Sequence, residues 1–322
     1  MTAARKTKRP ARGLGKVVVT GICGRLGKRV ARVLHRTRPV VGVDRREFPD
    51  RPKDIHHEAI DLRRKKLKDV FRAGDVEAVV HLGIMHDPRA SAAEHHSWNV
   101  EGFGKLLEYA AQFRVPNVVV LSSANVYGPQ PQNPQFLTEE APLLGGARFS
   151  EIRDLIEVDM LAQSFFWKHS PAASVETVIL RPVHILGSVH NAPSNFLRLK
   201  TIPTLLGYNP MVQVIHEADV VRAIECALAP KVRGIFNVAG PDPLPLSRVI
   251  GMLGRRTFPV PHSLARATLQ RLWSLRLTSF PAPELDHIRD VCMVDDTRAR
   301  SILGFAPLRD IEETVLAVDS DR

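Results

Sequence analysis

Cysteine is scarce in this sequence of 322 residues, and the three that occur are widely separated. Their spacing matches neither a metal-binding nor a redox motif, which argues against a disulfide scaffold and favours a reducing compartment. Long apolar runs are also lacking, since no stretch approaches the roughly 18 residues needed to span a bilayer. No apolar leader segment is present either, so we expect a soluble, cytoplasmic protein. The cysteines are Cys23, Cys226 and Cys292.

Acidic residues are absent from the first sixteen positions, which hold six of the lysines and arginines behind the net charge of +11. Such a tail can contact nucleic acid or an anionic membrane surface. Aromatic side chains, which would stack on bases, do not interleave these charges. We therefore interpret residues 1–14 as a disordered, solubilising tail and do not expect nucleic-acid binding.

What the sequence does contain is an alternation of short apolar runs, rich in β-branched residues, with segments of helical spacing. This alternation predicts βαβ units, and hence an α/β fold with a Rossmann-type doubly wound parallel sheet. The main predicted strands are 16–21, 40–44, 76–81, 117–123 and 175–181, and the long predicted helices are 92–113 and 151–169.

The pattern loosens beyond about residue 185. We predict a dinucleotide-binding domain at 15–185 and a smaller mixed substrate-side lobe at 186–322. Within that lobe, two short strands flank a helix in the segment 211–240, which we expect to pack back on the first domain.

A glycine-rich loop, GICGRLG, joins the first predicted strand to the first predicted helix. Glycine permits a tight turn, close approach of a pyrophosphate to the backbone, and close packing of helix on strand. The helix N-terminus then offers free N–H groups to the phosphates. The alternative is a tight turn that binds nothing. The predicted cofactor-binding residues of this loop are Gly21, Gly24, Arg25, Leu26 and Gly27.

An acidic residue, Asp44, ends the second predicted strand and is suited to bind both ribose hydroxyls of NAD. Arg45 and Arg46 follow at once and could hold the 2′-phosphate of NADP. We expect NAD as the cofactor, with NADP as the alternative, and include Asp44 and Arg45 in the predicted site.

Further short motifs follow in order along the chain: Asp61-Leu62, His81-Leu82-Gly83, Asn99-Val-x-Gly102, Ser122-Ser123-x-x-Val-Tyr127-Gly128, Leu180-Arg-Pro182, His216-x-x-Asp219, Phe236-Asn-Val238 and Leu303-Gly-Phe-x-Pro307. Together with the glycine loop they resemble the NAD-dependent epimerase/dehydratase family of extended short-chain dehydrogenases/reductases. That resemblance implies a nucleotide-sugar or another alcohol or ketone as the small-molecule substrate. It also implies that Asp61 and Leu62 lie beside the adenine, that Leu82, Gly83 and Ile84 lie near the nicotinamide half, and that Asn99 and Ser122 complete the cofactor site.

One departure from the family pattern concerns catalysis. The family uses Tyr-x-x-x-Lys, in which the lysine lowers the pKa of the tyrosine that exchanges the proton. The chain has three tyrosines, and none has a lysine four residues later. Alignment through Asp159 puts Glu151 at the tyrosine position and Leu155 at the lysine position. Ser123 therefore occupies the position of the family's catalytic serine or threonine without its partners.

Three other polar residues could take over the proton transfer: His86, His184 and Glu151. His86 follows the His81 motif in a loop that normally faces substrate, and His184 follows the Leu180-Arg-Pro strand. A histidine can exchange a proton near neutral pH. The alternative for each residue is a hydrogen-bonded loop or cavity position. We interpret Tyr127 as a packing residue of its motif.

Three predicted helical segments bear on which partners the protein binds. Segments 92–113 and 151–169 correspond to the dimer contact of family members, and the second is apolar on more than one side, which favours a homodimer over burial beneath the loop 128–147. Segment 263–277 mixes leucines with arginines. It could be a basic amphipathic helix that contacts lipid or a hydrophobic substrate, but we favour a helix that faces the core with its arginines in solvent.

Two functions from different classes therefore stand. The first is an epimerase, dehydratase or reductase with an altered acid/base. The second is a non-catalytic sensor or scaffold that kept the cofactor site and lost the tyrosine and lysine.

Overall fold

A seven-stranded parallel sheet forms the centre of the computed structural model, which describes residues 15–85, 90–147, 150–169, 175–275 and 282–320. Every neighbouring pair runs parallel, so the predicted doubly wound α/β fold is confirmed. The basic tail lies outside the described residues. The strands, in spatial order, are β11 (Gly234–Val238), β6 (Glu176–Pro182), β5 (Asn117–Leu121), β4 (Val76–His81), β1 (Lys16–Thr20), β2 (Val40–Asp44) and β3 (His56–Ala59).

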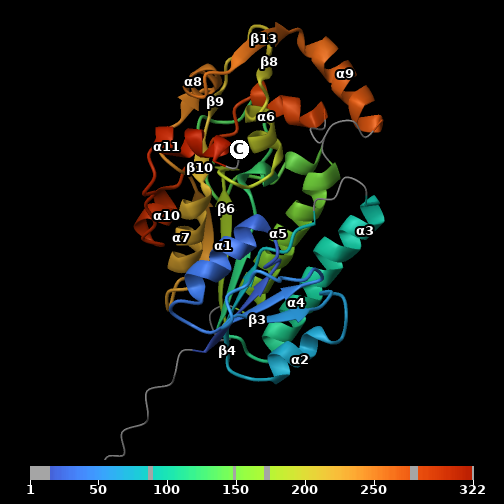
Figure 1. The fold of residues 1–322 in the computed structure, drawn as a ribbon, viewed down its shortest axis with the longest axis vertical. Coiled ribbons are helices and arrows are strands. Elements are labelled where there is room, and N and C mark those ends of the chain that lie inside the picture. Colours follow the sequence, from blue (N-terminus) through green and yellow to red (C-terminus); the bar gives the residue numbers. More distant parts are fainter. Residues whose placement is uncertain (1–14, 86–89, 148–149, 170–174, 276–281, 321–322) are drawn as a thin grey trace, which may run out of the picture.

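Helices cover both faces of this sheet and divide its core in two (Figure 1). The buried side chains of α1 and α7 belong to one apolar cluster, and those of α2 and α4 belong to the other. Helix α5 contributes to both: Ile152 and Leu155 to the first, and Val158, Ala162 and Phe165 to the second. Because both faces are covered, central strands such as β1, β2 and β5 are mostly apolar instead of alternating, whereas the edge strand β3 is polar and partly exposed. The helices are α1 (Arg25–Leu34), α7 (Glu217–Ala227), α2 (Leu67–Arg72), α4 (Gly102–Gln112) and α5 (Ser150–Lys168).

The segment predicted as one helix over 92–113 contains a change of winding. It runs as α3 (Ala92–His96), a π-helical turn (Ser97–Glu101) and α4. Ser91 caps α3 by accepting the backbone N–H of Glu94. A π turn inside a helix widens it locally and is frequent at functional sites. Here it carries Trp98 and Asn99, both buried.

Most of the elements that follow β6, apart from β11 and α7, build a smaller lobe with its own apolar core, and this lobe lies beyond the upper end of the sheet in Figure 1. Three two-stranded sheets support it: β7 with β10 and β8 with β13 are parallel, and β9 with β12 is antiparallel. Its elements, with those that complete the chain, are β7 (His184–Leu186), α6 (Ala192–Leu197), β8 (Thr201–Leu205), β9 (Met211–Val212), β10 (Val214–His216), β12 (Leu244–Pro245), α8 (Leu246–Met252), β13 (Arg256–Val260), α9 (His262–Ser274), a 3-10 segment (Ala282–Ile288), α10 (Thr297–Ser301) and α11 (Ile311–Leu316).

Glu217 fastens the lobe to α1. Its buried carboxylate pairs with Arg29 of α1 at 2.7 Å and accepts hydrogen bonds from the backbone and hydroxyl of Ser188. Gly187 precedes that serine with φ of +130°, and a Cβ atom there would lie 2.6 Å from the Glu217 carboxyl. Arg25 adds a hydrogen bond to the Ser188 carbonyl at 2.6 Å. The helix that begins at the glycine loop is therefore tied to the smaller lobe.

The helix α9 corresponds to the segment that we expected to face the core. Ala265 and Leu269 do pack against the lobe core. Leu264 and Leu275, however, are 58% and 65% exposed, so the core-facing interpretation describes only one side of this helix. In the described part of the chain, no helix combines the length and apolar character needed to cross a bilayer.

Candidate functional site

The glycine loop lies where β1 and β4 end side by side, at the point where the strand order reverses direction. Gly21 has φ of +71°, and a Cβ atom on it would lie 2.7 Å from the Cα of Gly83. A Cβ atom on Gly27 would lie 2.3 Å from the Gly21 carbonyl oxygen. The fold itself therefore requires two of the three glycines.

Gly24 is different, because a Cβ atom there would approach only the Gly21 carbonyl, at 3.2 Å. Its φ of −67° is open to any residue, and it precedes the first turn of α1, formed by Arg25, Leu26 and Gly27. The first N–H groups of a helix have no intrahelical acceptor and attract anions. Glycine at this position leaves room for a phosphate to reach the backbone, so the loop fits a dinucleotide.

Asp44 lies buried at the end of β2 and is bonded to the glycine loop: its Oδ2 accepts the backbone N–H of Cys23 at 3.1 Å. Arg46 also reaches this carboxylate, donating from Nε to Oδ1 and from Nη2 to Oδ2, each at 3.1 Å. Burial, together with repulsion from Asp44, raises the pKa of the Cys23 thiol to about 11. That thiol is neutral at physiological pH and is poorly suited to act as a nucleophile.

A second group of charges surrounds Trp98. The guanidinium carbons of Arg45 and Arg63 lie 5.0 Å and 5.4 Å from the centre of its ring. Arg63 also donates Nε and Nη2 to Asp61, at 3.0 Å and 2.6 Å, and helps to hold the pKa of Asp61 below its ordinary value against the effect of burial. Leu62 is buried in the core. The region predicted to bind the adenine therefore carries two guanidiniums, those of Arg45 and Arg63, close to the Trp98 ring.

The loop after β4 is held by two side chains of the π-helical turn. Asn99 accepts the Met85 N–H at 2.7 Å and donates to the Met85 carbonyl at 3.3 Å. The indole N–H of Trp98 donates to the Gly83 carbonyl at 3.3 Å. These bonds fix the backbone of Leu82, Gly83 and Ile84 against the glycine loop. Asn99 thus acts on this site by positioning its backbone.

His81 ends β4 beneath that loop. It is fully buried, shares a 2.7 Å hydrogen bond between its Nδ1 and the Thr20 hydroxyl, and stacks on Phe103. Burial lowers its pKa to about 3, so the imidazole is neutral. It supports the ends of β1 and β4 from below.

A buried polar network lies below the end of β5. Arg181 donates to both oxygens of Asp159 at 2.9 Å and 2.7 Å, and the Ser122 hydroxyl donates to the same carboxylate at 2.6 Å. Ser123, the next residue, is half-buried, and its hydroxyl accepts the Asn125 N–H at 3.1 Å. The two adjacent serines therefore have different roles, one within the core and one at the strand end.

Tyr127 belongs to the same network. Its hydroxyl donates to Asn237 and accepts from Arg181, both at 2.7 Å. Burial raises its pKa to about 12. A tyrosine with this pKa and with its hydroxyl used in the core is a poor general base near neutral pH.

Two of the predicted catalytic residues cannot be placed in full. His86 lies outside the described residues, and Glu151 belongs to the first turn of α5 with its side chain outside them. Leu155, one turn further along α5, is buried in the core with 6% exposure.

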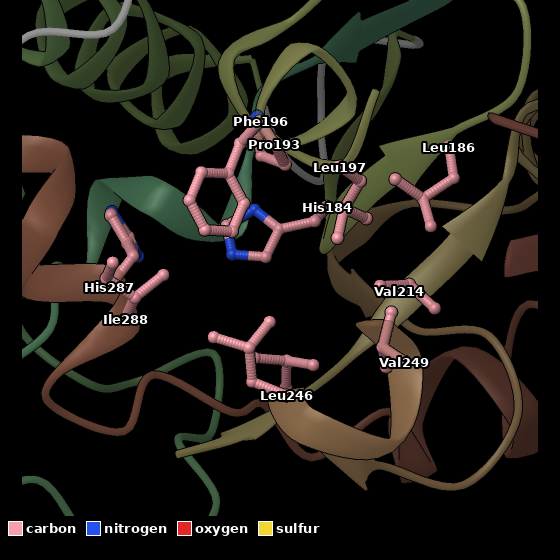
Figure 2. Close-up of a pocket in the computed structure, with 11 residues that line it drawn as sticks. His184, Leu186, Pro193, Phe196, Leu197, Val214, Leu246, Val249, His287 and Ile288 are labelled. Atoms are coloured by element: carbon pink, nitrogen blue, oxygen red, sulfur yellow. The ribbon is translucent and has the colours of Figure 1, made fainter. Parts of the chain in front are cut away.

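His184 lines a cavity of about 40 Å³ within the smaller lobe, and most of the other lining residues belong to the apolar core of that lobe (Figure 2). His287, which sequence reasoning did not single out, packs against it edge to face, with the ring centres 5.3 Å apart and an angle of 78° between the ring planes. Desolvation lowers the pKa of His184 to about 4 and that of His287 to about 3, the latter also through repulsion from His184. Both imidazoles are therefore neutral near pH 7.

Comparison with known proteins agrees with this arrangement. The sequence model of the NAD dependent epimerase/dehydratase family matches residues 17–239, more than half of the chain. The chain therefore belongs to the NAD-dependent epimerase/dehydratase family.

Relatives of known sequence are distant. An uncharacterised protein of Mycobacterium tuberculosis is 28% identical over 260 residues, which make up 77% of this chain and 66% of that relative. A UDP-glucose 4-epimerase of Dictyostelium discoideum is 24% identical over 168 residues, 50% of this chain and 48% of the relative. The matches thus span less than two thirds of these relatives.

Solved structures share the fold. MoeE5, in complex with UDP-glucuronic acid and NAD, has a TM-score of 0.72 at 23% identity, covering 94% of this chain and 97% of that one. The UDP-glucose 4-epimerase of Thermotoga maritima, with UDP-glucose, has a TM-score of 0.72 at 17% identity, covering 95% and 98%.

Proposed function

We propose that this chain binds NAD(H), in preference to NADP(H), across the glycine loop, with residues 15–185 holding the cofactor and residues 186–322 holding the substrate. One observation carries the proposal. The Asp44 carboxylate is bonded to the Cys23 N–H of the glycine loop, so a ribose-binding acid and a phosphate-binding loop form one surface. Membership of an NAD-dependent family and the NAD named in the MoeE5 complex support it.

The proposed activity is redox chemistry at a secondary alcohol or ketone, of the epimerase, dehydratase or reductase type. Bound nicotinamide would supply or accept the hydride. The chain must then move one proton at the substrate oxygen without the Tyr-x-x-x-Lys pair. Ser123 at the end of β5 can hydrogen-bond that oxygen. His184 is the described imidazole suited to exchange the proton, and His86 and Glu151 are the further candidates.

The second proposal is a dinucleotide-dependent sensor or scaffold without catalysis. It is favoured by the buried Leu155 at the lysine position and by the use of the Tyr127 hydroxyl in the core. Cofactor binding is common to both proposals, and turnover separates them.

Thermal unfolding tests the shared part. A ligand that binds only the native state raises the melting temperature, by the equivalent of about 2.7 kcal/mol at one hundred times its Kd. We expect NAD⁺ or NADH at millimolar concentration to raise it. The absence of a shift with all four dinucleotides would overturn both proposals. A structure with NAD⁺ would then identify the groups nearest nicotinamide C4.

We also propose a homodimer through the outer faces of the helices at 92–113 and 151–169. The inner apolar side chains of α5 are buried within the chain itself, on two clusters, so they do not need a partner. The outer face, however, exposes Met160 by 55% and Trp167 by 68%. Light scattering should give a molar mass of two chains for the wild type and of one chain for Trp167→Glu. A wild type that has the mass of one chain at micromolar concentration would refute the dimer.

A further inference from the structure

The tip of the smaller lobe, which we define as β8, β13 and α9, carries charge of one sign. Residues 183–216 and 243–283, which include these three elements, hold eight lysines and arginines and no acidic residue. In Figure 1 the three elements lie at the upper end of the long axis, away from β3 and β4. The chain therefore concentrates positive charge at one end of the folded molecule.

Part of this charge has no partner within the chain. Arg255 is paired, since its guanidinium lies 2.6 Å from the Asp319 carboxylate. Lys200, Arg256 and Arg271, in contrast, are exposed, and none of the three forms an ion pair with any residue that the structure describes. Such cations attract a surface that bears phosphate or carboxylate groups.

Large apolar side chains are exposed among these charges. Leu206, directly after β8, is 59% exposed, and Phe258 of β13 is 47% exposed. The Leu206 N–H donates to the Val260 carbonyl, and α9 begins two residues after Val260, so Leu206, Phe258 and the exposed Leu264 lie near the point where β8, β13 and α9 meet. Exposed apolar side chains gathered in one place mark a contact surface.

Helix α9 presents both kinds of group to solvent. Ala265 and Leu269 pack against the lobe core, yet no described side chain of this helix is buried. The Leu275 N–H donates to the Arg271 carbonyl, which extends the helical winding to Leu275. With about 3.6 residues per turn, Leu264, Arg271 and Leu275 fall on one stripe, on the side away from Leu269.

The combination of charge and exposed leucine selects among the partners that such a surface can have. A second copy of this chain would place cation against cation, without acidic residues in these segments to compensate. A nucleic acid would supply phosphates, but it would leave the leucines against water and the charged backbone. The surface of an anionic bilayer supplies phosphates for the arginines and hydrocarbon for the leucines.

From these observations we propose that the tip of the smaller lobe binds the surface of an anionic phospholipid membrane. Leu264 and Leu275 enter the boundary between headgroups and acyl chains, and Arg256 and Arg271 pair with lipid phosphates. The contact is peripheral, because α9 lies along the surface and does not span the bilayer. It uses none of the residues proposed to bind the cofactor, so it does not depend on the proposed function.

Co-sedimentation with vesicles tests the proposal on the full chain. Wild-type protein should bind vesicles of equal parts phosphatidylcholine and phosphatidylserine, and phosphatidylcholine alone only weakly. Leu264→Ser with Leu275→Ser should weaken binding by at least about tenfold without changing the net charge. Arg256→Gln with Arg271→Gln should weaken it by roughly twentyfold at low salt, since each basic residue near an anionic membrane contributes about fivefold.

Two matched variants serve as controls outside the tip. Ile302→Ser with Leu308→Ser removes two apolar side chains that are each more than 60% exposed. Arg36→Gln with Arg64→Gln removes two exposed charges. Both should bind vesicles within about twofold of wild type. Melting temperatures establish that every variant is folded.

Hydrogen exchange on the wild-type protein locates the contact without any substitution. The mixed vesicles should slow exchange in peptides from β13 and α9 and leave α2 unchanged. The proposal is overturned if the mixed vesicles are not bound, or if the leucine variant binds as tightly as wild type, which would place the contact elsewhere, the basic tail included. It is also overturned if duplex DNA, or a second copy of the chain, occupies the tip while vesicles do not.

Discussion

The Arg46 guanidinium donates a hydrogen bond to each carboxylate oxygen of Asp44, both at 3.1 Å. The ribose hydroxyls of NAD would need the same carboxylate, and a 2′-phosphate would be drawn to the same guanidinium. The two residues therefore oppose each other in cofactor choice. Because Asp44 is buried and Arg46 is 59% exposed, the carboxylate is fixed and the arginine is the partner that can move aside.

This opposition predicts cofactor preference. Wild-type protein should bind NAD(H) more tightly than NADP(H). Asp44→Ala should narrow the preference about tenfold or more, since hydrogen bonds to a charged group contribute about 1.5–3 kcal/mol. Arg46→Ala should widen it. Titration calorimetry with both cofactors measures the ratio, and equal or tighter binding of NADP(H) by the wild type would show that Arg45 and Arg46 dominate.

Gly24 separates cofactor binding from folding. Gly24→Val should abolish the melting-temperature shift with NAD⁺, because its side chain would occupy the approach of the pyrophosphate. The free variant should unfold close to wild type, since its Cβ meets only the Gly21 carbonyl at 3.2 Å. Gly251→Val is the matched control, because a Cβ atom there meets nothing within 4 Å. A full NAD⁺ shift in Gly24→Val would place the pyrophosphate elsewhere.

Hydride transfer of the tyrosine-dependent kind should be absent or very slow. Loss of a general base lowers rates by about 10² to 10⁴, and loss of the lysine weakens nicotinamide positioning as well. A screen of sugar nucleotides and simple ketones, followed at the nicotinamide absorbance band, measures this. Fast turnover would mean that another residue replaces the tyrosine. Alanine variants of His86, His184 and Glu151 would then identify it, and full activity in the triple variant would put the active site elsewhere.

Breaking the Asp159–Arg181 ion pair should lower the free energy of unfolding strongly, because both side chains are at most 1% exposed. Asp159→Asn leaves a buried guanidinium charge without its counter-ion, and breaking such a pair costs about 3–5 kcal/mol. Urea denaturation measures the free energy of unfolding. Glu313→Gln is the control, since Arg309 and Glu313 form an exposed pair expected to contribute no more than about 0.5 kcal/mol. Equal losses in the two variants would contradict the prediction.

His81 should make stability depend on pH. Its pKa is about 3 in the folded protein against 6.5 ordinarily, so between these values the unfolded chain binds the extra proton. Stability is therefore full above pH 6.5 and falls as the pH drops toward 3. His81→Asn should reduce the slope by up to about 1.4 kcal/mol per pH unit. His56→Asn, with its side chain 66% exposed, should keep the wild-type slope.

Most elements of the first half were predictable from local pattern. Strands such as Lys16–Thr20 are runs of β-branched residues, and long helices such as α5 repeat apolar residues at helical spacing. Missed elements, including α2, α6 and α8, have only six or seven residues. Two turns of helix are marginal alone and owe their stability to tertiary packing, so no local signal marks them.

In the candidate site, local sequence pattern identified the residues that the backbone conformation requires. It did not identify residues whose position depends on contacts with distant segments. Gly21 is required by the tight turn after β1, and Gly27 is required because α1 packs closely on the loop backbone. Trp98 gave no motif signal, yet the guanidiniums of Arg45 and Arg63 lie near its ring and its indole N–H donates to the Gly83 carbonyl. A buried indole in a π-helical turn could have signalled its role only once the fold was known.

The sequence by itself determined the parallel sheet, the position of the glycine loop and the acid that follows it, because each depends on residues near one another along the chain. Only the tertiary structure decided which partners those residues meet. It bound the Asp44 carboxylate to the Cys23 N–H, placed the Tyr127 hydroxyl against Asn237 within the core, and brought His287 beside His184 at an apolar cavity. Such contacts join segments far apart in sequence, where side-chain packing, and no local periodicity, sets the distance.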